Sequence, residues 1–205
     1  MRVIAGKYRS RRLKGPGKLR LRPTSDRLRE TLFNVLAPLI VGSRFLDVFA
    51  GTGAIGIEAL SRGAAEVVFI ENHAPAATLI RRNLESLSIN TGATVLAVDA
   101  LRGLAMLAAR KSVGAPAFDH VFLDPPYSAA EDYARVLEFL GSATLLAPGA
   151  IVVAEHRRNF DLREEAGALR RFRVLRQGDA ALSFYRRAAK IALPSKPPLA
   201  ELHLS

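Results

Sequence analysis

Two clusters of residues have the types and the spacing that chemistry requires, and the first is a glycine-rich turn. Gly51, Gly53 and Gly56 form a G-x-G-x-x-G pattern, in which glycines let the backbone approach a ligand and let the next helix point its N-terminus at it. Glu71 follows Gly51 by 20 residues, where nucleotide-binding folds carry an acid that binds ribose hydroxyls. The turn predicts a site for a nucleoside-containing cofactor.

Asp47 distinguishes between two cofactors of this kind. It precedes Gly51 by four residues, within the end of a strand where dinucleotide-binding folds normally carry apolar residues. An acid there suits a cationic amino-acid group better than a pyrophosphate, which favours S-adenosylmethionine over NAD. A structural role, in which Asp47 caps backbone amides of the turn, is compatible with this function and equally well supported.

The second cluster is the tetrapeptide Asp124-Pro125-Pro126-Tyr127, which follows an apolar run. The prolines fix the backbone and leave carbonyl groups without competing N–H donors. Asp124 and the Pro125 carbonyl could accept the two hydrogens of an exocyclic base amine, while Tyr127 stacks on the base. A strand-terminating turn is the alternative, and the predicted position beside the glycine-rich turn favours the functional interpretation.

Together the two clusters predict methylation of a base amine. Acceptors that draw on both amine hydrogens favour a pyramidal nitrogen, so positioning and electrostatics would carry most of the rate. Asp124 needs no unusual basicity, because the nitrogen becomes acidic as it gains the methyl group. The chain has no cysteine, and methylation at a pyrimidine C5 would require a thiolate nucleophile.

The elements that must position these clusters form an α/β alternation. Short apolar runs alternate with helical periods, which predicts a mostly parallel sheet covered on both faces. Strands are expected over residues 44–49, 67–71, 94–98, 121–124 and 151–155, and helices over 54–61, 74–87, 101–110 and 131–140. Runs on either side of Gln177-Gly178-Asp179 predict an antiparallel hairpin at one edge. An earlier helix carries Leu28 and Leu32 on one face and is expected to end at Pro38.

The charge is concentrated at the two ends of the chain. Residues 1–29 hold 11 Lys or Arg against one acid, whereas residues 30–156 hold 8 bases and 13 acids. Residues 157–205 hold 11 bases and 5 acids, an excess diffuse enough for an ordinary solvated surface. The first 29 residues resemble a hairpin and turn more than an amphipathic presequence, and they predict a nucleic-acid-binding arm.

Composition excludes several classes of protein. The chain has 205 residues, enough for one domain of ordinary size, with 49% hydrophobic and 24% charged residues. Without cysteine, disulfides, iron–sulfur clusters and thiolate catalysis are excluded. The longest stretch without a charged residue, 139–154, is too short to span a membrane, so a soluble, cytoplasmic protein is expected. No metal is expected either, because the four histidines (His73, His120, His156 and His203) lack metal-ligand spacing and are interpreted as structural or surface residues.

From residue 2 to about residue 187, the sequence resembles the bacterial 16S ribosomal RNA guanine-N2 methyltransferases, the family of ribosomal RNA small subunit methyltransferase D. Many amino-methyltransferases share the two clusters, whereas the N-terminal segment is specific to this family. The matching segments are Arg2-Val3-Ile4-Ala5-Gly6, Arg9, Arg11, Leu13, Leu21-Arg22-Pro23-Thr24, Asp26-Arg27, Arg29-Glu30, Leu32-Phe33-Asn34, residues 47–56 and 58–64, Glu71, Asp99-Ala100, Asp124-Pro125-Pro126-Tyr127, Glu155 and Gly178-Asp179.

The resemblance implies a Rossmann-like class I methyltransferase fold with a seven-stranded sheet, whose last strand is inserted antiparallel. It implies that Glu71 holds the cofactor ribose, Asp99 the adenine amine, and loop 47–53 the methionine end. The cofactor-binding residues implied are Asp47, Phe49, Ala50, Gly51, Thr52, Gly53, Glu71, Asp99 and Ala100. Asp124, Pro125, Pro126 and Tyr127 would hold the guanine, and Arg9, Arg11, Arg22, Thr24, Arg27 and Arg29 would contact the RNA.

The expected domain organisation is a basic arm and helix (1–37), a methyltransferase domain (38–188) and a C-terminal tail (189–205). The implied partner is 16S rRNA, in the small ribosomal subunit or an assembly intermediate, bound by a monomer. His73, Gln177 and Ala180 depart from the family pattern, which weakens inferences about how the edge hairpin meets the substrate. A DNA adenine or cytosine amino-methyltransferase and a non-catalytic assembly factor are the alternatives, although no connection here is long enough for a DNA-recognition insert.

Overall fold

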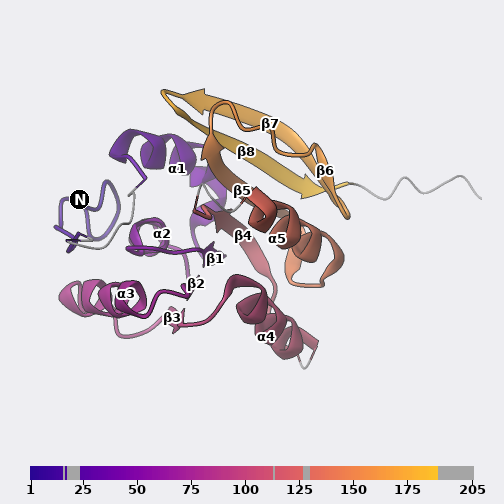
Figure 1. Ribbon diagram of the computed structural model, residues 1–205. Coiled ribbons are helices and arrows are strands. Elements are labelled where there is room, and N and C mark those ends of the chain that lie inside the picture. Colours follow the sequence, from indigo (N-terminus) through magenta and orange to yellow (C-terminus); the bar gives the residue numbers. More distant parts are fainter. Residues whose placement is uncertain (16, 18–23, 113, 127–129, 189–205) are drawn as a thin grey trace, which may run out of the picture.

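The computed structural model describes residues 1–15, 17, 24–112, 114–126 and 130–188, and these residues form an α/β sandwich around one sheet (Figure 1). The strand order is β3-β2-β1-β4-β5-β8-β7-β6. The first five positions in this order are parallel strands: β3 (Ala93–Leu96), β2 (Glu66–Ile70), β1 (Arg44–Val48), β4 (Phe118–Leu123) and β5 (Leu146–Arg157). The mostly parallel sheet predicted from the alternation is confirmed.

The last strand, β8 (Ala180–Arg187), is inserted antiparallel between β5 and β7 (Leu169–Gln177). The hairpin predicted around Gln177-Gly178-Asp179 is therefore present, and its second strand lies inside the sheet. An eighth strand, β6 (Glu165–Ala166), pairs with β7 at the edge. The family resemblance implies seven strands and does not include β6. Two residues are too few to give a pattern of alternating hydrophobicity in the sequence.

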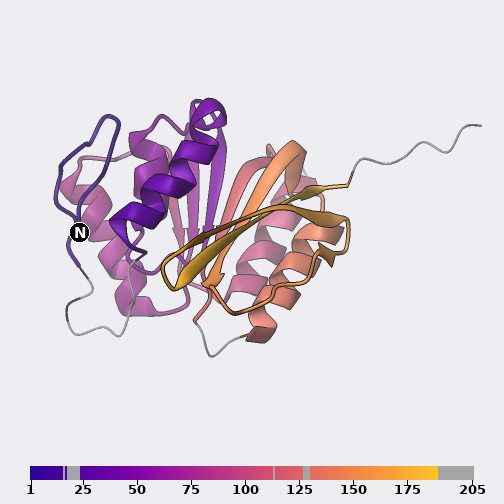
Figure 2. The ribbon, with the colours of Figure 1, turned by 90° about the horizontal axis from the view of Figure 1, so that it is seen from above.

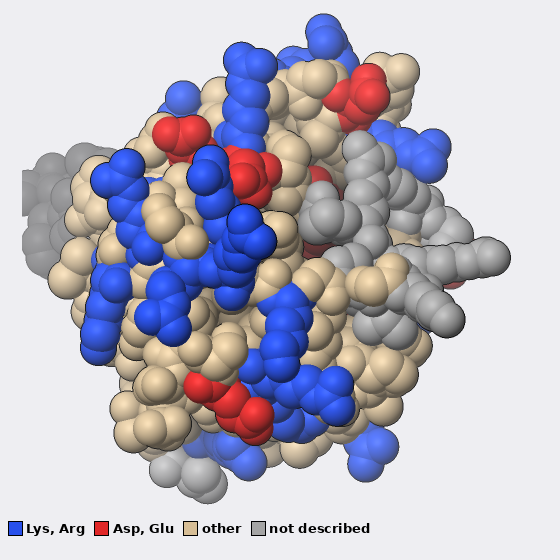
Figure 3. Space-filling view, turned by 90° about the vertical axis from the view of Figure 1, so that its left-hand side faces the viewer, with Lys and Arg blue, Asp and Glu red and all other residues tan. Residues whose placement is uncertain are grey.

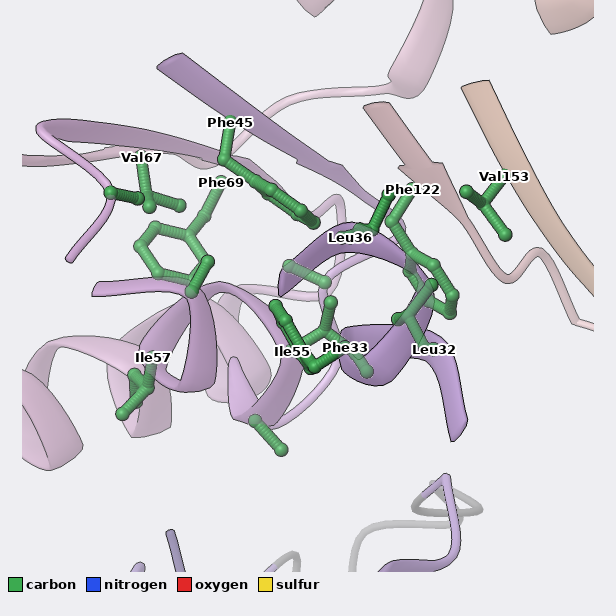
Figure 4. Packing of buried hydrophobic residues seen from close by; sticks show 14 of the residues in the cluster. Leu32, Phe33, Leu36, Phe45, Ile55, Ile57, Val67, Phe69, Phe122 and Val153 are labelled. Atoms are coloured by element: carbon green, nitrogen blue, oxygen red, sulfur yellow. The ribbon is translucent and has the colours of Figure 1, made fainter. Parts of the chain in front are cut away.

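Helices cover both faces of the sheet, as Figure 2 shows from above. One face carries α1 (Asp26–Ile40), α2 (Ala54–Ser61) and α3 (Ala74–Ser86), and the other carries α4 (Ala100–Ser112) and α5 (Ala130–Ser142). Leu32, Phe33 and Leu36 of α1 pack with Phe45 and Phe122 of the sheet (Figure 4). None of the helices in the described part of the chain is long and apolar enough to cross a membrane.

Helix α1 differs from its predicted form at one end. Ser25 caps its N-terminus by accepting a hydrogen bond from Leu28 N–H at 3.2 Å, as the polar residues before it predict. The expectation that Pro38 ends the helix is wrong, since the helix continues to Ile40, which is buried. Pro38 removes one hydrogen bond of the helix, the one that an N–H at position 38 would donate to the Asn34 carbonyl, and this loss falls at the exposed residue Asn34 in the helix's final turns.

The N-terminal arm, residues 1–15, folds back on itself and packs on α2. An antiparallel bridge joins Arg2 and Arg12, and Val3 and Leu13 are buried in the same cluster as α1 and α2. Gly6 has φ +81°, and a Cβ built there would lie 1.8 Å from the Ser61 carbonyl oxygen, so only glycine fits. The arm is thus fixed to α2, the helix that follows the glycine-rich turn.

Candidate active site

A cavity of about 400 Å³ lies at the carboxyl ends of the parallel strands. Strands β1 and β4 are neighbours, with Val48 paired to Leu123, although β2 and β3 lie between them in the chain. This reversal of strand order is where open α/β sheets bind ligands, and it brings the two sequence clusters together. The cavity is lined by Thr24, Asp47, Phe49, Ala50, Gly51, Thr52, Ala54, Ile55, Glu71, Asn72, His73, Asp99, Phe122, Asp124, Pro125, Pro126, Asp132 and Glu155.

The glycine-rich turn forms one wall of this cavity, and its backbone is tightly constrained. Phe49 has φ 63°, a left-handed conformation that costs a non-glycine residue free energy and is concentrated at functional sites. Gly53 has φ 76° and caps α2, and a Cβ built there would lie 3.1 Å from the Ile80 side chain of α3. Gly56 lies in α2, where a Cβ would lie 2.2 Å from the ring of Phe69. Gly53 and Ala100, two predicted cofactor residues, stand behind the cavity wall and are absent from its lining.

Asp47 lies beneath the turn and combines the two roles considered for it. Its Oδ2 accepts a hydrogen bond from Gly56 N–H at 2.9 Å, so the carboxylate caps the first turn of α2, and it also lines the cavity. The residue is only 1% exposed. Burial raises the pKa of Asp47 well above its ordinary value, and the charge of Glu71 raises it further. The hydrogen bond from Gly56 N–H lowers the pKa but does not offset burial.

The Asp47→Asn variant should be more stable than the wild type, by a margin that grows with pH. A carboxyl group with a raised pKa in the folded state binds its proton more tightly when folded, so ionising it opposes folding. This cost increases as pH rises from the ordinary pKa of 3.8 toward the raised value. Asparagine keeps an oxygen for Gly56 N–H. Urea unfolding of both proteins between about pH 4 and pH 8 measures the difference. A pH-independent difference in unfolding free energy would contradict the prediction.

Glu71 and Asp99 follow the neighbouring strands β2 and β3 and complete this wall. Glu71 accepts hydrogen bonds from Gly51 N–H at 2.7 Å and from His73 N–H at 2.8 Å, one on each carboxylate oxygen. Asp99 caps α4 by accepting from Leu101 N–H at 3.0 Å. A carboxylate has about four lone-pair sites, so both side chains retain acceptor capacity toward the cavity.

The opposite wall contains Asp124, Pro125 and Pro126, at the end of β4. Pro125 is buried, whereas Pro126 is exposed. Tyr127, the fourth predicted catalytic residue, lies outside the described residues, as does Arg22. The cavity thus joins the glycine-rich turn and the Asp-Pro-Pro segment, which are more than 70 residues apart in the chain.

Sequence reasoning missed several residues of the lining. In the sequence Glu155 is only a match to the family pattern, yet it lines the cavity and accepts a hydrogen bond from Thr24 Oγ1 at 2.8 Å. Its position at the end of a predicted strand is the signal that would have identified it. Asp132 lies in the first turn of α5, where an acid is ordinary. His73, expected to be a structural or surface residue, is exposed and also lines the cavity beside Glu71.

The predicted RNA-contacting residues separate into three groups. Thr24 lines the cavity through its contact with Glu155. Arg9, Arg11 and Arg27 are exposed on the arm and on α1. The prediction that Arg29 contacts RNA is wrong, because its side chain is 0% exposed and donates to Arg2 O at 2.6 Å and to Asp26 at 2.9 Å.

The cavity is acidic. Six of its described lining residues are carboxylates, and none is Lys or Arg (Asp47, Glu71, Asp99, Asp124, Asp132 and Glu155). Within the described residues, no group of three or more His, Asp or Glu could hold a metal ion. His120 and His156 are buried and bond to Leu39 O and to Ser183 Oγ, while His203 lies outside the described residues. This electrostatic environment suits an organic cation.

Comparisons with known proteins agree with this arrangement. The family model described as "Conserved hypothetical protein 95" matches residues 1–186. Ribosomal RNA small subunit methyltransferase D of Escherichia coli K12 is 40% identical over 157 residues, which cover 76% of this chain and 74% of the relative. The corresponding protein of Haemophilus influenzae is 39% identical over 158 residues, covering 76% of this chain and 78% of the relative.

Solved structures share the fold. A hypothetical protein of Thermus thermophilus is 31% identical with a TM-score of 0.74, covering 90% of this chain and 98% of that one. An O-methyltransferase of Bacillus cereus, solved in complex with SAH, has a TM-score of 0.55 at 19% identity over 68% of this chain and 60% of that one, so it supports the fold alone. From the family model and the two curated relatives, we conclude that the chain belongs to the family of ribosomal RNA small subunit methyltransferase D.

Proposed function

We propose that this protein transfers a methyl group from S-adenosylmethionine to the exocyclic N2 amine of a guanine in 16S ribosomal RNA. The observation that carries the proposal is the single cavity shared by the glycine-rich turn and the Asp124-Pro125-Pro126 segment. One segment has the features of a cofactor site, and the other those of a base-amine site. The name of the two curated relatives, ribosomal RNA small subunit methyltransferase D, supports ribosomal RNA as the substrate.

The acidic lining fits the cofactor. S-adenosylmethionine would supply a methyl group on a positively charged sulfur, next to a charged ammonium group. Six carboxylates and no lysine or arginine line the described cavity, an arrangement that would repel the pyrophosphate of a dinucleotide. In this proposal Asp47 and the turn hold the methionine end, the free lone pairs of Glu71 accept from the ribose hydroxyls, and Asp99 accepts from the adenine amine.

Asp124 and the Pro125 carbonyl would orient the guanine amine. Both are acceptors, so each can take one N2 hydrogen and direct the nitrogen lone pair toward the methyl group. The new N–CH₃ bond forms as the S–CH₃ bond breaks, and the electron pair of that bond remains on sulfur. The proton lost from N2 passes to Asp124 or to water beside it, and Asp124 stabilises the positive charge that develops on the nitrogen.

The RNA would bind across the arm and α1. Figure 3 shows Lys and Arg gathered on the side of the molecule where the arm and α3 lie in Figure 1. The exposed basic residues of these elements are Arg2, Lys7, Arg9, Arg11, Arg12, Lys14, Arg27, Arg81 and Arg82. A groove of about 430 Å³ between the arm and α1 is lined by three arginines and two acids: Arg2, Arg9, Arg27, Asp26 and Glu30. Such contacts position a phosphate backbone and do not read sequence.

Removing Arg9 and Arg27 together should weaken RNA binding in a salt-dependent manner. Each lost phosphate contact reduces the slope of log K against log salt by about 0.7 to 0.9. Filter binding of 16S rRNA particles at several salt concentrations measures this slope. Arg102→Ala with Arg110→Ala is the matched control, because both arginines are exposed on α4, on the other face of the sheet. Equal slopes for the two double variants would contradict the role of the arm.

The proposed function is tested with methyl-labelled S-adenosylmethionine and small subunits from a strain lacking the endogenous activity. Unrelated RNA and duplex DNA are assayed in parallel, and the products are digested to nucleosides for mass spectrometry. We expect label in N2-methylguanosine from subunits alone. Label in DNA adenine would show that the proposed substrate, ribosomal RNA, is wrong. Tight subunit binding without label would identify a non-catalytic assembly factor.

A further inference from the structure

Asn83 of α3 is fully buried and bonds two segments that are far apart in the chain. Its Oδ1 accepts from Lys14 N–H at 2.8 Å, and its Nδ2 donates to the Lys14 carbonyl at 3.2 Å. The amide therefore pairs with both backbone groups of one arm residue. Nδ2 also donates to the Thr52 carbonyl at 3.2 Å. Because an amide nitrogen has two hydrogens, both donors are in use.

Thr52 belongs to the glycine-rich turn, and the surroundings of Asn83 support that turn directly. Ile80, one helical turn before Asn83, is the side chain that a Cβ at Gly53 would crowd, at 3.1 Å. Met1 Sδ of the arm lies 3.6 Å from Thr52 Oγ1. The arm and the turn thus meet at one position on α3, and Asn83 stands behind the cavity wall and does not line the cavity.

We propose that Asn83 is a positioning residue that holds the glycine-rich turn and the basic arm in one arrangement, so that cofactor affinity and docking of the arm depend on each other. The inference rests on the proposed function for the identity of the cofactor. A turn already fixed at Thr52 loses less conformational freedom when it binds a ligand, which raises affinity. Any such coupling is reciprocal, so the bound cofactor also stabilises the docked arm.

Ser61 provides a matched control, because it fastens the same arm without contacting the turn. Its Oγ donates to the Ala5 carbonyl at 2.5 Å and accepts from Tyr8 N–H at 2.9 Å. Ser61 is buried at the C-terminal end of α2, whereas the glycine-rich turn precedes the N-terminal end of that helix. Ser61→Ala therefore weakens the hold on arm residues 5 and 8 alone, while the bonds of Asn83 to Lys14 and Thr52 remain intact.

The experiment compares the full-length wild type with Asn83→Ala, Asn83→Asp and Ser61→Ala. Titration calorimetry measures the Kd of S-adenosylmethionine, and hydrogen exchange at Lys14 N–H is measured with and without it. Asn83→Ala should raise the Kd about 10-fold, the cost of leaving a buried carbonyl unpaired. Asn83→Asp retains the acceptor for Lys14 N–H but cannot donate to Thr52, so its Kd should rise at least as much. Ser61→Ala should change the Kd less than about twofold.

The cofactor should also slow exchange at Lys14 N–H in the wild type and in Ser61→Ala, but not in Asn83→Asp, which keeps the acceptor for Lys14 N–H and loses the donor to Thr52. A merely structural role for Asn83 would not remove this response. Wild-type cofactor affinity in both Asn83 variants, or an equal loss in Ser61→Ala, would overturn the inference while the proposed function stands. Failure of the wild type to bind S-adenosylmethionine would overturn the proposed function and this inference with it.

Discussion

The Asp124→Ala variant should lose methyl transfer by about 100- to 1,000-fold, while S-adenosylmethionine binds with nearly wild-type affinity. Asp124 stands at the end of β4, on the opposite wall from Glu71 and Asp99. Its removal takes away an acceptor for the target amine and a charge beside the developing cation. The cofactor wall is untouched. The expected result is therefore a large fall in kcat with a small change in cofactor Kd.

Single-turnover assays on small subunits, together with calorimetry, separate the two effects of this substitution. Asp124→Asn is an informative companion, because it keeps the size of the side chain but presents an N–H₂ group that can face the amine hydrogens. Asp161→Ala is a suitable control, because Asp161 is an exposed carboxylate whose side chain is 92% accessible. Equal turnover by Asp124→Ala and the wild type would exclude a catalytic role for Asp124.

The Glu58→Ala variant should be destabilised by about 3 to 5 kcal/mol, because it leaves the buried cation Arg29 without its main counter-charge. Both side chains are 0% exposed, with Arg29 Nε 4.0 Å from Glu58 Oε2. Burial already lowers the pKa of Arg29, and Glu58 opposes that effect more than any other charge. Arg29 Nε and Nη1 also lack hydrogen-bond partners within the described structure. Asp26 would remain 2.9 Å from Arg29 Nη2, but its side chain is 51% exposed, so solvent weakens its compensation of the buried charge.

Glu58 also holds the arm, which adds to the expected loss of stability. Its two carboxylate oxygens accept from Ile4 N–H at 2.8 Å and from Ala5 N–H at 3.0 Å, and Arg62 Nε donates to Oε1 at 2.7 Å. Chemical unfolding measures the loss. Glu165→Ala is the matched control, since Glu165 pairs with Arg170 at the surface, where the two side chains are 71% and 69% exposed, and its loss should cost less than about 1 kcal/mol. Similar losses in the free energy of unfolding for the two variants would show that the buried network contributes no more to stability than a surface ion pair.

The sheet and the cofactor wall could be predicted from the sequence because their signals are local. Apolar runs of strand length alternate with helical periods, and the glycines of the turn stand at fixed offsets from Asp47 and Glu71. Backbone constraints at Gly53 and Gly56 then follow from close contacts with Ile80 and Phe69. Such contacts require glycine whatever the rest of the chain does, so they leave a readable pattern.

The role of Arg29 could not be predicted, because its environment is assembled from distant segments. In the sequence Arg29 is one of 11 basic residues within the first 29, and charge alone assigns it to the surface. Its partners Arg2, Asp26 and Glu58 come from the arm, α1 and α2. The same reasoning applies to Glu155 and Thr24, which meet only because the chain just before α1 lies against β5. Buried polar networks of this kind depend on tertiary packing, which has no local period.

The insertion of β8 between β5 and β7 has a consequence for folding while the chain is being synthesised. Synthesis delivers β7 before β8, yet β7 hydrogen-bonds only to β8 and β6 among the described strands and cannot take its place beside β5 alone. The edge of β5 therefore stays open until Arg187 has been translated. An open strand edge invites pairing with other chains. Folding during synthesis therefore leaves the edge of β5 exposed to such pairing until β8 is in place.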